Sequence, residues 1–121
     1  MTGVKTYKDL LVWQKGIQLV KLVYTGLESF PKDEIFGLQN QMKRAAVSVP
    51  SNIAEGWGRN STQSYLQFLK IARGSLFELE TQLILARELK FIQDIKFNEI
   101  ADLITEESKM LNALIKTVSN T

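Results

Sequence analysis

The sequence predicts an all-α fold: an up-down-up-down antiparallel four-helix bundle that forms a single domain over residues 1–121. Apolar residues recur at spacings of three and four in four separate stretches, as they do on one face of an amphipathic helix. No stretch alternates apolar and polar residues with the period of two that a half-buried strand requires. The segments between the four stretches are short, so consecutive helices must run antiparallel.

The first helix is predicted from Leu10 to Leu27, and it carries the strongest periodic signal in the chain. Thr6, with Asp9 three residues later, can cap its N-terminus, and Phe30-Pro31 ends it because proline disfavours helical geometry in the residue before it. Its apolar residues form a heptad seam that we expect to face the core. The seam consists of Leu10, Trp13, Ile17, Val20, Tyr24 and Leu27.

The second helix is predicted to begin at Asp33, which can act as its N-cap, and to end at Gly56-Trp57-Gly58 with glycine as the left-handed stop. Its apolar face consists of Ile35, Leu38, Met42, Ala45 or Ala46, Val49 and Ile53. Pro50 lies inside this helix and removes the hydrogen bond to the carbonyl of Ala46. Because the apolar spacing continues through Ile53, we favour a proline kink over a break that restarts at Ser51 or Asn52.

The third helix is predicted to open at Ser61 and the fourth at Asp94, each acting as an N-cap. The seam of the third helix consists of Tyr65, Phe68, Ala72, Leu76, Leu79, Leu83 and Ala86. The seam of the fourth consists of Phe97, Ile100, Ile104, Leu111, Ile115 and Val118, with Glu107 or Ser108 interrupting it.

A polar stripe follows the second helix at steps of three and four. If the second and third helices turn about Arg59-Asn60, Ser75 and Glu78 come to lie beside this stripe. We therefore predict a structural polar network that fixes the register of the bundle. Its candidate members are Arg44, Ser48, Asn52, Glu55, Ser75 and Glu78. The alternative is a surface for a ligand or a nucleic acid, on which Arg44 and Arg73 are exposed.

The charge is unevenly distributed along the chain, although the net charge is only +2. Residues 37–77 carry five basic residues and one acid, whereas residues 78–121 carry five basic residues and eight acids. A basic middle can attract an anionic partner, and the alternative is a solvated surface of mixed charge. The candidate nucleic-acid-binding residues are Lys43, Arg44, Arg59, Lys70 and Arg73.

The composition argues against an enzyme. The chain has no histidine and no cysteine, so it lacks the commonest general base, the commonest transition-metal ligand and any thiolate. We expect no catalytic residues, no metal site and no cofactor. No apolar stretch is long enough to cross a membrane and the N-terminus has no signal-peptide core, so we expect a cytoplasmic protein.

Two further features point to association. Trp57, between two glycines, can stack on a base, insert into a neighbouring subunit or pack over the end of its own bundle. Several apolar residues fall outside the predicted seams, and a large residual apolar patch usually marks an interface. These residues are Val12, Leu19, Val23, Leu66, Leu69 and Ile84. We therefore predict a homo-oligomer, and a cyclic one.

Three segments carry a family resemblance: YKDLLVW (Tyr7–Trp13), FPKDEIFGLQNQMKRAAVSVPSNIAEG (Phe30–Gly56) and RGSLFELE (Arg73–Glu80). They resemble the 23S ribosomal-RNA intervening-sequence protein family of bacteria. The resemblance implies a four-helix bundle that assembles as a ring-like homopentamer. The chain is also similar to the accessory proteins of diversity-generating retroelements, which are basic pentameric bundles that engage nucleic acid and a reverse transcriptase.

The sequence and the resemblance together favour a non-enzymatic oligomeric bundle that binds structured RNA through its basic middle. The alternative is a protein-interaction or scaffold module with no nucleic-acid role.

Overall fold

The computed structural model describes residues 3–121, and it consists of four helices joined by short connections. The helices are α1 (Leu11–Gly26), α2 (Leu38–Trp57), α3 (Thr62–Glu88) and α4 (Asp94–Ser119). Short 3-10 turns precede or follow α1 at Tyr7–Asp9, Leu27–Ser29 and Lys32–Glu34. Residues 3–121 contain no strand, so the predicted all-α fold with four helices is confirmed.

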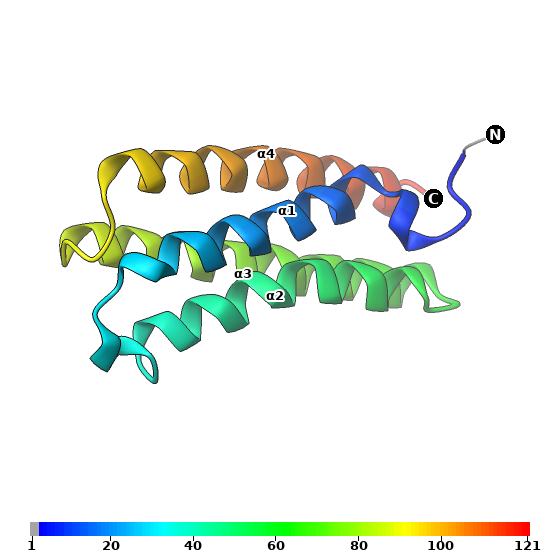
Figure 1. The fold of residues 1–121 in the computed structure, drawn as a ribbon. Helices are drawn as coiled ribbons and strands as arrows, with labels where there is room; N and C mark the ends of the chain where they lie inside the picture. The colour runs from blue at the N-terminus through cyan, green and yellow to red at the C-terminus, as the bar shows by residue number, and fades with distance from the viewer. Residues whose placement is uncertain (1–2) are drawn as a thin grey trace.

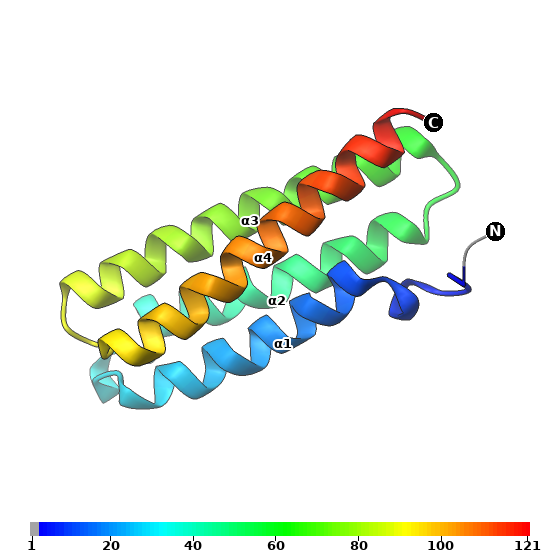
Figure 2. The ribbon, with the colours of Figure 1, turned by 90° about the horizontal axis from the view of Figure 1, so that it is seen from above.

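The four helices pack around one core. Figure 1 shows that the chain reverses direction at each connection and that α1 lies between α4 and α2, and Figure 2 shows α1 and α3 on opposite sides of the bundle. Every helix contributes fully buried aliphatic side chains, each of which stabilises the fold by about 1.5–3 kcal/mol. The largest of them are Leu19, Leu27, Met42, Ile53, Leu69, Leu76, Leu79, Leu83, Ile100, Ile104 and Leu111.

The register predicted for α1 is wrong. The buried residues of α1 lie on a different face of the helix from the predicted seam. They are Val12, Gly16, Leu19, Val23 and Gly26. Of the seam, only Leu27 is buried, whereas Ile17 and Tyr24 are exposed. The seam residues Leu10, Trp13 and Val20 are only partly buried against the core.

The two buried glycines explain this register. A methyl group added at Gly16 would lie 3.1 Å from an oxygen of Glu107 on α4 and 3.2 Å from Pro50 on α2. One added at Gly26 would lie 2.9 Å from Ile100 on α4. The backbone of α1 therefore approaches its neighbours on the face where it has the smallest side chains.

The beginning of α2 also differs from the prediction. Residues 32–34 form a 3-10 turn after Pro31, and the helix starts at Leu38 instead of following Asp33. Glu34 supplies the cap, because its Oε1 accepts a hydrogen bond from the Leu38 amide at 3.1 Å. Ile35 and Phe36 lie in the turn before the helix and are exposed, so Ile35 is not part of the core.

The other helix ends are a mixture of confirmed and corrected predictions. Thr6 and Asp9 form a capping box, but on the short turn before α1. The hydroxyl of Ser61 accepts a hydrogen bond from the Ser64 amide at 3.1 Å, as predicted for the start of α3. Asp94 is the first residue of α4 and not its cap. Gly58 has a φ of −77°, so no left-handed glycine ends α2.

The left-handed residue in the described chain is Lys90, with a φ of 63°. The Phe91 amide donates to the Ala86 carbonyl at 2.8 Å, and the Lys90 amide donates to the Arg87 carbonyl at 2.9 Å. These two bonds form a Schellman motif that ends α3.

Helix α2 continues through Pro50 without interruption. The alternative of a break that restarts at Ser51 or Asn52 is therefore wrong. A kink at Pro50 stays a prediction.

Candidate functional site

The polar stripe of α2 meets α3 at a cluster of short side chains. The hydroxyl oxygens of Ser48 and Ser75 lie 2.8 Å apart. Asn52 lies one turn after Ser48, and its Nδ2 donates to the Ser48 carbonyl and the Ser48 hydroxyl, at 2.8 Å each. All three side chains are partly buried, so these bonds are sheltered from water and hold α2 against α3.

Next to this cluster lies a polar cavity of about 340 Å³ between α2 and α3. It is lined by Gln41, Arg44, Ala45, Ser48, Ser75 and Glu78. Arg44 and Glu78 share this cavity, but no ion pair joins them within residues 3–121. Glu78 accepts a hydrogen bond of 3.3 Å from the Nε2 of Gln82 instead.

The last member of the predicted network is separate from the cluster. Glu55 forms an ion pair with Arg59, one turn later on α2, with 2.8 Å between Oε2 and Nη2. The guanidinium of Arg59 lies over the ring of Phe68 on α3, 4.8 Å from its centroid. Both charged side chains are about half exposed, so this ion pair contributes little to stability.

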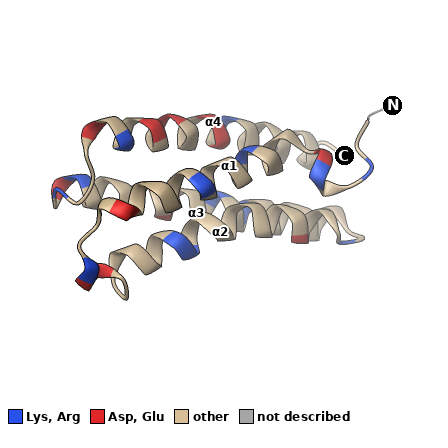
Figure 3. Cartoon of the chain, in the orientation of Figure 1, with Lys and Arg blue, Asp and Glu red and all other residues tan. Residues whose placement is uncertain are grey.

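The five candidate nucleic-acid-binding residues do not form one patch on a single copy of the chain. The ammonium of Lys43 lies 5.0 Å from the ring centroid of Tyr24 on α1, at the seam between α1 and α2. Arg73 donates to the Asn112 side chain on α4 at 3.1 Å, at the seam between α3 and α4. Figure 3 likewise shows Lys and Arg spread over several helices.

Three of these five residues have neither a carboxylate partner nor a side-chain hydrogen bond in the part of the chain that the structure describes, whereas Arg59 pairs with Glu55 and Arg73 with Asn112. The three are Lys43, Arg44 and Lys70. Lys70 and Arg44 are also exposed, so their charges are available to an anionic partner.

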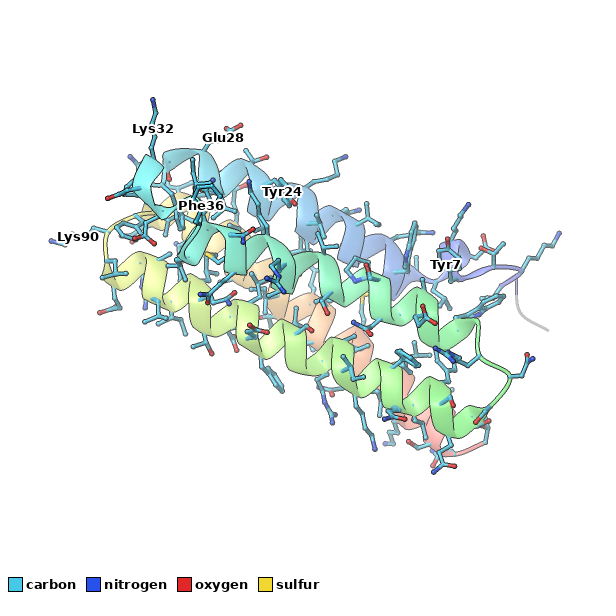
Figure 4. The ribbon with its side chains drawn as sticks, turned by 90° about the horizontal axis from the view of Figure 1, so that it is seen from below. Tyr7, Tyr24, Glu28, Lys32, Phe36 and Lys90 are labelled. Atoms are coloured by element: carbon cyan, nitrogen blue, oxygen red, sulfur yellow. The ribbon has the colours of Figure 1, made fainter. Side chains whose placement is uncertain are left out.

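One apolar surface of the bundle was not predicted from the sequence. A groove of about 300 Å³ runs along the outside of the bundle between α1 and α2. We call it the α1–α2 groove, and its lining consists of Tyr7, Trp13, Ile17, Val20, Val47, Pro50, Ser51 and Ala54. Four of these residues are large and apolar: Trp13, Ile17, Val20 and Val47. Tyr24 lies further along α1, beside the same boundary between α1 and α2 (Figure 4).

Aromatic rings close one end of the α1–α2 groove. Tyr7 packs edge-on against Trp13, with 5.3 Å between ring centroids, and against Trp57, with 6.4 Å. The sequence leaves three positions open for Trp57, and this contact agrees with the one in which it packs over the end of its own bundle. Tyr7 links the turn before α1 to the last residue of α2.

A second apolar surface lies on the other side of the bundle. Ile71, Phe77, Ile84 and Leu85 on α3 are each exposed by 43–50%. We call this surface the α3 outer face. Gly74 lies among these residues, and nothing approaches within 4 Å of the position its Cβ would occupy.

The described residues contain no group of three His, Cys, Asp or Glu side chains that could hold a metal ion. No helix within residues 3–121 is long and apolar enough to span a membrane. The molecule is thus a four-helix bundle whose main surface features are an apolar groove and a polar cavity.

Sequence comparison then identifies the family. The chain belongs to the 23S rRNA-intervening sequence protein family, whose sequence model matches residues 8–113. The resemblance predicted from the three sequence segments is therefore confirmed. A search of curated proteins found no match.

A solved structure supports the fold. The chain is similar to the crystal structure, at 1.70 Å resolution, of a protein with unknown function from the S23 ribosomal protein family of Bacteroides thetaiotaomicron VPI-5482. The TM-score is 0.82 at 24% sequence identity, and the alignment covers 90% of this chain and 98% of that chain.

Proposed function

We propose that this protein is a non-enzymatic module that self-associates, and that the α1–α2 groove is the main contact between copies. The observation that carries the proposal is the exposed heptad seam of α1. Ile17 is 37% exposed and Tyr24 44%, and Val47 on the facing side of α2 is 40% exposed. Aromatic and large aliphatic side chains in a contiguous strip are typical of the buried centre of a protein interface.

The second apolar surface favours a ring over a simple dimer. A two-fold dimer uses the same patch on both copies, whereas a head-to-tail contact joins two different patches and closes into a ring. The α1–α2 groove and the α3 outer face are two such patches, and α1 and α3 are not adjacent in the bundle. The resemblance to homopentameric bundles gives the expected number of copies. Five copies of the 13.8 kDa chain weigh about 69 kDa.

Light scattering coupled to gel filtration at micromolar concentration tests this proposal. We expect a mass near that of five chains for the native protein. Ile17→Asp should lower the mass while the helical circular dichroism is kept, because it places a charge in the groove. The matched control is Ile95→Asp on α4, since Ile95 is 76% exposed and lies outside both apolar surfaces. A native mass of one chain, 13.8 kDa, would refute self-association.

Structured RNA is the second candidate partner. The support consists of three candidate cations that have neither an ion pair nor a side-chain hydrogen bond within the described residues, Lys43, Arg44 and Lys70. The family name, which refers to intervening sequences in 23S rRNA, is the second support. A ring would repeat these charges in each copy. Phosphate contacts release counterions, so their contributions accumulate and weaken with salt.

The RNA proposal is tested by filter retention of a structured RNA over a range of salt concentrations. Replacing Lys43, Arg44 and Lys70 together with Gln should flatten the salt dependence. The matched control replaces Lys5, Lys32 and Lys90 with Gln, which removes the same charge; Figure 4 shows Lys32 and Lys90 projecting from one end of the bundle. No salt-sensitive retention of the native protein would leave the alternative, an interaction or scaffold module without a nucleic-acid role.

A further inference from the structure

The bundle core contains one carboxyl group that the proposed function does not use. Glu107 on α4 is 0% exposed. Both of its carboxyl oxygens are shielded from solvent, and neither accepts a hydrogen bond from a donor within residues 3–121. An ionised carboxylate in such a place lacks both water and donors, which is far more costly than burying the neutral acid.

The carboxyl lies where α1, α2 and α4 meet. The Cβ position of Gly16 on α1 is 3.1 Å from Oε2 of Glu107 and 3.2 Å from Cβ of Pro50 on α2. The carboxyl and the proline ring thus face each other across a glycine. A larger residue than glycine on α1 would separate them.

Pro50 also leaves a hydrogen-bond acceptor on α2 without its usual backbone donor. It has no N–H to give to the carbonyl of Ala46, one turn earlier on α2. Ala46 is 0% exposed, so water does not reach this carbonyl. A buried acceptor without a donor is destabilising, and a protonated carboxyl carries one O–H to donate.

We propose that Glu107 is protonated in the folded protein and that its O–H donates a hydrogen bond to the Ala46 carbonyl that Pro50 leaves free. The proline and the buried acid are then one unit, in which a side chain on α4 replaces a missing backbone hydrogen bond of α2. Loss of the proton leaves a buried charge beside an unpaired carbonyl. The stability of the bundle therefore depends on pH in the neutral range.

The electrostatic surroundings agree with this assignment. Burial raises the pKa of Glu107 from 4.5 to about 8, and the ammonium of Lys15 on α1 opposes this shift. Lys15 is engaged at the surface, 3.2 Å from Oε1 of Glu106. No charged group of α2 or α3 contributes to the pKa of Glu107.

The direction of the pH effect follows from the raised pKa. Between the unfolded value of 4.5 and the folded value of about 8, the folded protein binds one proton more than the unfolded chain. The stabilisation contributed by Glu107 is therefore fully present below pH 4.5, is lost as the pH rises and levels off above the folded pKa. The chain has no histidine and no cysteine, so few other groups titrate between roughly pH 6 and 8.

Urea unfolding of the whole protein between pH 5 and 9 tests the protonation. Protein concentration is held fixed, because unfolding of an oligomer depends on it. We expect the folding constant of the native protein to fall by up to about tenfold per pH unit in this window. Glu107→Gln should remove this dependence, because the amide is neutral and still donates. Glu106→Gln, the exposed neighbour, should keep the native dependence.

A second comparison tests the acceptor. At pH 6, Glu107→Gln should fold more favourably than Glu107→Met by about fivefold, since only Gln donates a hydrogen bond. In a Pro50→Ala background, the backbone N–H restored at position 50 serves the Ala46 carbonyl and the difference should disappear. A difference that persists in that background would refute the assignment of Ala46 as acceptor.

Carbon-13 NMR of the Glu107 carboxyl gives a readout that needs no variant to fold. A titration midpoint well above 4.5 is expected, and a midpoint near 4.5 would overturn the proposal. A pH dependence that is unchanged in Glu107→Gln would overturn it equally.

Discussion

The hydroxyl oxygens of Ser48 and Ser75 lie 2.8 Å apart, in a hydrogen bond between the side chains of α2 and α3. Asn52 donates to the same Ser48 hydroxyl. Ser48 thus takes part in two side-chain contacts and Ser75 in one. The two serines come from different sequence segments, and their contact joins α2 to α3.

This contact predicts a measurable coupling. Ser75→Ala should destabilise the fold by about 1 kcal/mol, and Ser48→Ala by more, because it also leaves the Asn52 amide without its hydroxyl acceptor. A double-mutant cycle in urea should give a coupling of about 0.5–1 kcal/mol. Gln63→Ala, at an exposed position of α3 outside the α1–α2 groove, is the control and should change stability by less than about 0.5 kcal/mol. Additive effects of Ser48 and Ser75 would contradict the contact.

Two helical glycines predict opposite effects of the same substitution. A Cβ at Gly56 would lie 2.7 Å from Cβ of Phe68, so Gly56→Ala should force α2 and α3 apart and cost about 1–3 kcal/mol. Gly74 has open space around its Cβ position, so Gly74→Ala should stabilise α3 by about 0.5–1 kcal/mol. Thermal unfolding of both variants measures the contrast. Equal shifts in the same direction would show that helix propensity alone governs both positions.

The polar cavity predicts the absence of a coupling. Arg44 and Glu78 line the same cavity but form no ion pair in the described chain. Alanine substitutions at the two positions should therefore add within about 0.3–0.5 kcal/mol in a double-mutant cycle. A coupling of about 1 kcal/mol or more would mean that the two side chains pair in solution, as the sequence-based network assumes.

Lys90 predicts a stabilising substitution. Its φ of 63° is costly for a residue with a Cβ, and the Schellman motif at this position favours glycine. Lys90→Gly should raise stability by about 0.5–1 kcal/mol. Lys109→Gly, at an exposed position inside α4, is the control and should lower stability by about 1 kcal/mol. A loss of stability in both variants would contradict the strained geometry.

The sequence predicts the number and approximate bounds of the helices, because long amphipathic stretches with short connections leave few alternatives. It does not predict which face of α1 is buried. Two stripes on this helix have helical spacing, and the buried one contains Gly16 and Gly26, which a hydrophobicity pattern does not count. The close approach of Glu107 to Gly16 and of Ile100 to Gly26 favours the buried face, and both are tertiary contacts.

The candidate site, too, could be predicted only in part from the sequence. The position of the α2–α3 turn predicts that Ser75 lies beside the polar stripe, but opposite Arg44; the structure pairs Ser75 with Ser48 instead, one turn further along α2. Whether Arg44 reaches Glu78 depends on long side-chain rotamers, which spacing does not fix. Glu107 interrupts an apolar seam in the sequence, and that interruption is the one signal that could have identified it as a buried acid.

Helix α1 begins and α4 ends at the same end of the bundle (Figure 1), and the two helices lie against each other. A pulling force applied between the two ends of the chain would therefore act on one end of the α1–α4 contact. It would peel the helices apart one turn after another instead of shearing the whole contact at once. The bundle is thus built to open from its terminal helices, with the α2–α3 hairpin and its serine contact as the part that yields last.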